Sequence, residues 1–160
     1  VTHPAARLDG VARVATALMW LTAGVLWALA GGALLTGASG VGIVMVLAAA
    51  LVAGLCIYYR RRQPLAYRIE PDALVVVERS RERRIDGPVA NARDGGLGMK
   101  VIGSGGLYGY LGRFRLKDRR GPARAYVSDL RRVAVVDVGD VAEAVSPENK
   151  KAFIEEARDA

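Results

Sequence analysis

The residues best suited to chemistry in this sequence are eight glycines that fall within residues 95–112. Backbone amides of a glycine-rich loop can approach a phosphate or another anion, which would make this stretch a binding loop. The sequence lacks both the G-x-x-x-x-G-K-[ST] motif of phosphate loops and the G-x-G-x-x-G motif of dinucleotide-binding folds. We therefore favour a structural role, in which the glycines permit positive φ angles and bulges between strands, or a mobile flap.

Aromatic rings interleave with these glycines. Tyr108, Tyr110 and Phe114 follow one another at even spacing, so in a strand they would point to one face of a sheet. They would then pack in the core, the role we favour, or form an exposed patch that dips into a membrane interface or meets a partner. With two neighbouring cations, the tentative contact residues of this region are Lys100, Tyr108, Tyr110 and Arg113.

Three arginines alternate ahead of the glycines, at Arg79, Arg81 and Arg83. Such a basic strand face would attract anionic lipid by about 1 kcal/mol per group near the surface. Glu78 and Glu82 lie among them, so a solvated face with local ion pairs is the alternative. The three arginines complete the set of tentative ligand or partner contacts.

Catalytic and metal chemistry find little support. The chain has one cysteine, Cys56, and one histidine, His3, which we expect at a frayed terminus. Zinc sites and Cys–His or Ser–His nucleophile pairs are therefore not expected, and the carboxylates form no convincing acid–base pair. We expect no enzyme activity, no catalytic residue, no metal and no cofactor. Residues 63–160 carry 18 basic and 15 acidic groups, so nucleic-acid binding is not expected either.

Two long uncharged runs, 14–35 and 41–59, dominate the first part of the chain. At about 1.5 Å per residue each run reaches across a hydrocarbon core of about 30 Å. We therefore predict a two-helix transmembrane anchor over residues 1–62. A buried hairpin of a soluble protein and a cleaved signal peptide are the alternatives, and a second span following at once argues against the latter.

Positive charges flank the two runs, at Arg7, Arg13 and Arg60–62, whereas residues 36–40 between them have none. The positive-inside rule then places both termini in the cytoplasm, in a multi-pass protein of the cell (inner) membrane. Small residues recur at helical spacing and could form the seam between the helices, unless they only reflect composition. They are Gly24, Ala28, Gly32, Ala50 and Gly54.

Residues 63–160 have the pattern of a mostly-β cytoplasmic domain. About seven antiparallel strands are predicted, at 66–69, 74–79, 83–89, 113–117, 123–127, 133–138 and 141–145. Ser146 and Pro147 then look like the N-cap and first position of a closing helix, with Phe153 on its apolar face. A helix after a sheet of this size would cover one open end or face.

The order of these elements resembles the pleckstrin-homology (PH) fold, a β-barrel or sandwich capped by a C-terminal helix. Four pieces, 67–74, 105–114, 125–130 and 145–148, are similar to bacterial PH-domain families of small membrane proteins. In such proteins two transmembrane helices commonly precede the domain. In PH domains that bind phosphoinositides, basic residues lie on the first two strands, and Arg68, Arg79 and Arg81 loosely match that arrangement.

The function expected from these features is that of a non-catalytic interaction module held at the inner membrane surface. Its expected partner is a membrane protein, with anionic-lipid binding through the basic strand face as the alternative. Membrane lipids surround the anchor in either case. The oligomeric state stays open, a homo-oligomer included.

The predicted topology is open to a direct test. A tag after Ala160 should resist protease in intact cells, and a cysteine introduced at Ser39 should react with an impermeant thiol reagent. The parent chain is the control, because its one cysteine lies inside the second apolar run. Digestion of the C-terminal tag from outside would contradict the orientation.

Overall fold

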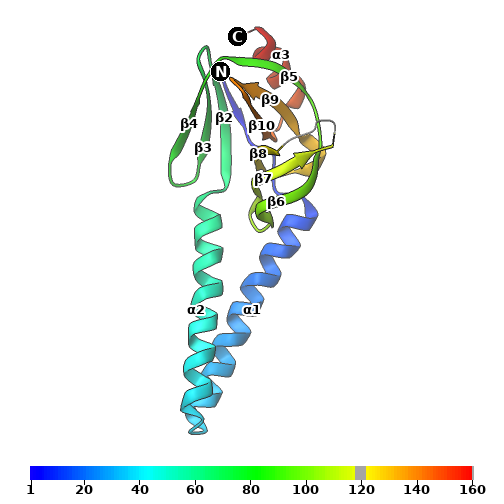
Figure 1. Cartoon of the computed structure of the whole chain (residues 1–160). Coiled ribbons are helices and arrows are strands. Elements are labelled where there is room, and N and C mark those ends of the chain that lie inside the picture. The colour runs from blue at the N-terminus through cyan, green and yellow to red at the C-terminus, as the bar shows by residue number, and fades with distance from the viewer. Residues whose placement is uncertain (118–121, 160) are drawn as a thin grey trace.

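The chain forms two long helices that carry a β domain at one end, as Figure 1 shows for this computed structural model. The structure describes residues 1–117 and 122–159. Helices α1 (Gly10–Leu35) and α2 (Ser39–Arg61) meet at a short turn and diverge towards the β domain. Both are long and apolar enough to cross a membrane, and only 11% and 17% of their most apolar windows are buried.

The seam between the two helices differs from the one predicted. Gly24, Ala28, Gly32, Ala50 and Gly54 are all exposed, so that prediction is wrong. The residues buried between the helices are spaced by seven instead, which is the repeat of left-handed coiled-coil packing. They are Ala23 and Ala30 on α1 and Gly42, Ala49 and Cys56 on α2.

Within the described residues, ten strands form two sheets. The four-stranded sheet has the order β1-β2-β3-β4. Its strands are β1 (Thr2–Pro4), β2 (Pro64–Glu70), β3 (Ala73–Glu78) and β4 (Glu82–Asp86). The six-stranded sheet has the order β5-β9-β10-β8-β7-β6, with only the β8–β10 neighbours parallel among the described strands. Its strands are β5 (Val89–Asp94), β6 (Leu97–Gly106), β7 (Gly109–Leu116), β8 (Pro122–Val127), β9 (Ala134–Val138) and β10 (Val141–Val145).

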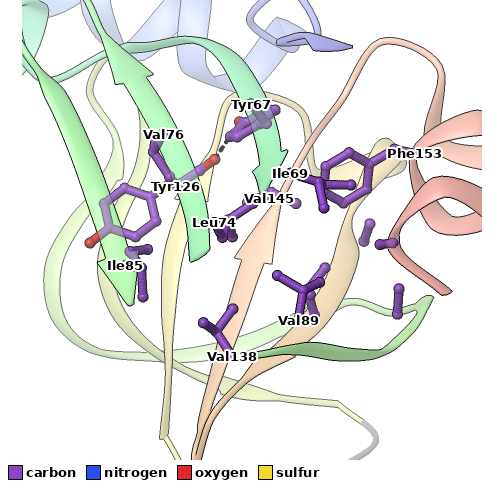
Figure 2. Packing of buried hydrophobic residues seen from close by; sticks show 14 of the residues in the cluster. Tyr67, Ile69, Leu74, Val76, Ile85, Val89, Tyr126, Val138, Val145 and Phe153 are labelled. Atoms are coloured by element: carbon purple, nitrogen blue, oxygen red, sulfur yellow. Dashed lines mark hydrogen bonds between the residues drawn. The ribbon is translucent and has the colours of Figure 1, made fainter. Parts of the chain in front are cut away.

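The two sheets pack as a sandwich and do not close into a barrel. Helix α3 (Lys150–Asp159) covers the sandwich. Figure 2 shows the core between the two sheets, where side chains from both meet Phe153 of α3. Phe153 is fully buried and packs edge-on against Tyr67, with ring centroids 6.2 Å apart. The predicted architecture of two helices, a mostly-β PH-like domain and a capping helix is thus confirmed.

The first residues of the chain were misread. His3 is 7% exposed rather than frayed, because β1 pairs with β2 and brings the ring onto the core. Its Nε2 lies 2.9 Å from Glu156 Oε2, and its ring packs edge-on against Phe153 at 5.2 Å. Chain segments on both sides of the helix pair therefore build one domain.

Ser146 does not cap the closing helix, contrary to the prediction. The helix begins at Lys150, and Asn149 supplies the cap by accepting a hydrogen bond from the Ala152 amide at 3.2 Å. Ser146 is fully buried, and its hydroxyl accepts a bond from the Ser128 amide at 2.7 Å. The serine thus joins the end of β10 to the end of β8.

A second buried hydroxyl completes this junction. Tyr67 donates its O–H to the Tyr126 carbonyl at 2.5 Å and accepts a bond from the Ser146 amide at 3.3 Å. Burial raises the pKa of Tyr67 to about 12, so the group keeps its proton throughout the physiological range.

Replacing Ser146 by alanine should destabilise the full chain by about 1–3 kcal/mol, because the buried Ser128 amide loses its acceptor. Asn149→Ala, at the observed cap, should cost about 0.5–2 kcal/mol. Thermal denaturation in detergent micelles measures both. Loss of less than about 0.5 kcal/mol for Ser146→Ala would contradict the junction described above.

Candidate functional site

The glycine-rich stretch forms the β6–β7 hairpin, not a phosphate loop. Gly103 and Gly112 face each other across the ladder, both with positive φ, at 128° and 132°. A Cβ on Gly103 would lie 2.0 Å from the Leu111 carbonyl oxygen, so only glycine permits this close approach. The register shifts twice between Leu97 and Ile102, as expected of the predicted bulges.

The tip of this hairpin is bonded to α1. The amide of Tyr108 donates to Thr16 Oγ1 at 3.1 Å, and Trp20 Nε1 donates to the Tyr108 hydroxyl at 2.7 Å. Tyr108 therefore fixes the hairpin beside the helix. The sequence indicated Tyr108 as a contact residue but gave no signal for its partner Trp20, which lies 88 residues away in the chain.

The other contact residues of the hairpin point in different directions. Tyr110 is buried and packs edge-on against Phe114, with ring centroids 6.5 Å apart. Lys100 and Arg113 are exposed on adjacent strands. The structure therefore does not gather Tyr108, Tyr110, Lys100 and Arg113 into one patch.

The basic turn between β3 and β4 lies beside the end of α2. The Arg79 amide donates to the Gln63 carbonyl at 3.1 Å, and the Ser80 amide donates to the Arg61 carbonyl at 3.2 Å. Arg79 and Arg81 are exposed there, and Arg81 Nε lies 3.1 Å from Glu78 Oε2. Arg83 follows on β4 and points to the space between the sheets.

A cavity of about 370 Å³ occupies that space, where α2 meets both sheets. We call it the inter-sheet cavity. Its walls come from the last turn of α2, from β3 and β4, and from the β6–β7–β8 strands. The lining residues are Tyr58, Tyr59, Arg62, Glu78, Arg83, Ile102, Gly103, Leu111, Gly112 and Tyr126.

Arginine–aromatic stacking shapes the cavity wall. The guanidinium of Arg62 lies 5.0 Å from the ring centre of Tyr58, and that of Arg83 lies 5.6 Å from the ring centre of Tyr126. Such stacking holds a guanidinium in place while its edge N–H groups stay available to an anion. Of these residues only Arg83 had been proposed as a contact.

Two buried carboxylates complete the electrostatics. Glu78 is 3% exposed and lines the cavity, and its Oε1 has no hydrogen-bond partner within the described ranges. Glu143 is fully buried on β10, and neither of its oxygens has a hydrogen-bond partner in that same part of the chain. The Nη1 of Arg124 lies 3.9 Å from its Oε1.

A sequence signal for Glu143 existed. It stands alone in the run Val-Ala-Glu-Ala-Val (141–145), where strand alternation puts it on the same side as Val145. Val145 belongs to the core between the sheets, so the carboxylate faces the interior.

The arrangement suits recognition of charge. Two arginines, Arg62 and Arg83, and one carboxylate, Glu78, line the same cavity. Within residues 1–117 and 122–159, no three His, Cys, Asp or Glu side chains come together as metal ligands. The chemistry that the site supports is the binding of a polar, charged group.

Burial raises the pKa of Glu143 to about 7, against the opposing attraction of Arg124 and Arg83. In the folded chain the carboxyl thus stays protonated at pH values above its ordinary pKa of 4.5. The free energy of unfolding is therefore highest below pH 4.5, where the carboxyl is protonated in both the folded and the unfolded chain. It falls by about 3 kcal/mol as the pH rises from 4.5 through about 7, because the unfolded chain then releases this proton more readily.

Glu143→Gln should remove most of this pH dependence, because an amide does not ionise. Melting temperatures of the full chain between pH 5 and 8 measure the effect. Glu155→Gln, on the exposed side of α3, is the matched control and should leave the profile unchanged. Equal profiles for parent and Glu143→Gln would show that Glu143 is not the buried acid described.

Comparison with protein families gives one match. A family model described as a bacterial PH domain matches residues 65–160, the chain from β2 through α3. Comparison with curated proteins and with solved structures gave no match. The matched segment contains every strand of the inter-sheet cavity wall. Because the match covers more than half of the 160 residues, this chain belongs to the bacterial PH-domain family.

Proposed function

We propose that the chain is a membrane-anchored, non-catalytic interaction module that binds a protein partner at the inner membrane surface. The family supports the coarser part of this statement, because PH domains are generally interaction modules without catalytic activity. The β6 edge strand carries the finer part.

Membrane insertion is supported by the helix pair. Large apolar side chains of α1 and α2 point outward, among them Leu21, Trp27, Leu47 and Leu51. In water, so much exposed apolar surface on two helices would be unfavourable, whereas in lipid it is matched by its surroundings. Basic residues at the domain end of both helices and none in the connecting turn favour a cytoplasmic domain.

Strand β6 is the outer strand of its sheet, and one of its edges has no neighbour among the strands that the structure describes. It exposes three apolar side chains, Met99 (67%), Val101 (49%) and Ile102 (69%), which we call the β6 patch. Both Val101 and Ile102 are exposed because the register shifts between Lys100 and Ile102. An exposed apolar patch on an edge strand is a common contact for a partner chain.

The position of the β6 patch favours a protein over lipid tails. The hairpin tip contacts α1 at Thr16, near the start of the first apolar run. At about 3.3 Å per residue, Ile102 lies about 13 Å and Met99 about 23 Å along the strand from Gly106 at the tip. The patch therefore extends from the proposed membrane surface into the region where a partner's cytoplasmic part would lie.

Ion pairs weaken the alternative, in which a basic strand face reads anionic lipid. Arg84 pairs with Glu70, Asp72 and Asp86, and Arg68 pairs with Glu70 and Glu82. These exposed arginines already have carboxylate partners, which lowers the local positive potential.

One observation nevertheless keeps that alternative open. The turn carrying Arg79 and Arg81 is bonded to the end of α2, next to Arg60–62. Anionic-lipid attraction through Arg79, Arg81 and Arg83 is therefore the second candidate function.

A photo-crosslinking residue at Ile102 in the full chain should yield one discrete protein adduct in native membranes. The same residue at Val141, an exposed apolar position on β10, is the matched control and should yield none. Val101→Glu should abolish the adduct, since a charge disrupts an apolar contact.

Charge reversal at Arg79 and Arg81 separates the two candidates. The adduct should survive it if the β6 patch binds a protein. An adduct that depends on the two arginines, or lipid adducts alone, would contradict the proposal. An adduct with a second copy of the chain would identify the partner as the protein itself.

A further inference from the structure

The inter-sheet cavity lies where α2 ends, and its walls combine both signs of charge with tyrosine rings. We propose that it binds the headgroup of a phospholipid that carries a phosphate diester and a primary ammonium, as phosphatidylethanolamine does. This inference rests on the membrane placement proposed above, and it concerns the inter-sheet cavity, which shares only Ile102 with the β6 patch and only Arg83 with the three arginines of the second candidate function.

The phosphate end of the ligand follows from Arg62 and Arg83. Each guanidinium is half-buried and stacked on a tyrosine, 5.0 Å from Tyr58 and 5.6 Å from Tyr126. They come from different elements, the C-cap of α2 and strand β4. Two fixed guanidiniums facing one cavity make a site for the delocalised charge of a phosphate.

The ammonium end follows from Glu78. Its Oε2 is bonded to Arg81 Nε at 3.1 Å, whereas Oε1 is buried in the cavity wall with no hydrogen-bond partner among the described residues. A buried carboxylate oxygen without a donor is unfavourable. A primary ammonium supplies both the missing donor and a positive charge.

The two ends must belong to one ligand. A phosphate alone would add a negative charge close to the buried Glu78, and an ammonium alone would meet Arg62 and Arg83. A zwitterion that puts its phosphate towards the arginines and its ammonium towards Glu78 satisfies all of these groups.

Size and position agree with a headgroup. A volume of about 370 Å³ is at the small end of ligand pockets and has no room for acyl chains. Tyr58 and Tyr59 end the second apolar run, at the level where aromatic rings lie in membrane proteins. A lipid beside the last turn of α2 would thus reach the cavity with its headgroup, while its chains stay along the helix.

The test uses the full chain in nanodiscs of equal phosphatidylethanolamine, phosphatidylglycerol and phosphatidylcholine with identical acyl chains. After extraction into mild detergent, native mass spectrometry counts the lipid that stays bound. We expect phosphatidylethanolamine to be retained about tenfold over each of the others. Phosphatidylcholine keeps the positive charge but has no N–H donor, and phosphatidylglycerol has O–H donors without the charge.

Three variants assign the contacts. Glu78→Gln should bring retention of phosphatidylethanolamine down to that of phosphatidylcholine, because the amide carries no charge for the ammonium. Arg62→Gln should lower retention of every phospholipid, because all three lipids carry the phosphate that Arg62 is proposed to bind. This second variant keeps the test valid if Glu78→Gln fails to fold. Glu82→Gln is the matched control and should change nothing, because Glu82 is exposed on β4 and does not line the cavity.

Other outcomes would overturn the inference. Equal retention of the three lipids would exclude a headgroup site, and preferred phosphatidylglycerol insensitive to Glu78→Gln would indicate a purely anionic ligand. Incorporation of the chain into nanodiscs of phosphatidylcholine alone tests membrane placement separately. If the chain enters these discs but shows no headgroup preference, the cavity proposal fails while the anchor stands.

Discussion

The arrangement of the whole molecule depends on the buried junction around Ser128 and Ser146. The Ser128 hydroxyl donates to the Ala6 carbonyl at 2.5 Å, and the Ala6 amide donates to the Ser146 carbonyl at 2.8 Å. Three residues later, Asp9 caps α1 and also accepts a bond from the Leu130 amide at 3.3 Å. The start of α1 is thereby bonded to the β sandwich, while α2 runs directly into β2. Because both helices are attached to the sandwich, a cavity shared by α2 and the two sheets can keep a fixed shape.

Whereas the buried hydrogen bonds of this junction stabilise the fold, a buried charge destabilises it. Placing Glu143 between the sheets without a hydrogen bond destabilises the fold whenever the carboxyl is ionised. Hydrophobic packing against Phe153 and Tyr67 does not need such a residue, and Val or Leu in its place would pack without that penalty. Glu143 does not line the inter-sheet cavity, but its charge is attracted by Arg83, which does. The cations Arg83 and Arg124 offset only part of the penalty, since burial remains the larger influence on the pKa of Glu143.

Local sequence patterns predicted those elements whose formation depends on neighbouring residues. The two helices, most of the strands and the closing helix follow from apolar runs, β-branched residues and turn signals. What failed depends on contacts between distant residues. His3 looked frayed because its partner Glu156 is 153 residues away, and Ser146 looked like a cap because Pro147 follows it. The candidate arginines were read as residues of an exposed strand face. The cavity that unites Arg83 with Glu78 and Tyr126 requires three elements to converge, and no spacing within one strand encodes that.

The β6–β7 hairpin joins the two proposed surfaces. Gly103 and Gly112 let the two strands approach closely, and the register shift next to them turns Ile102 outward. Ile102 therefore belongs to the β6 patch and also lines the inter-sheet cavity. A partner seated on the patch would cover one wall of the cavity, so a headgroup bound there and a protein bound outside would contact the same side chain. Binding at either surface changes the surroundings of the other, and by linkage any effect on affinity must be equal in both directions.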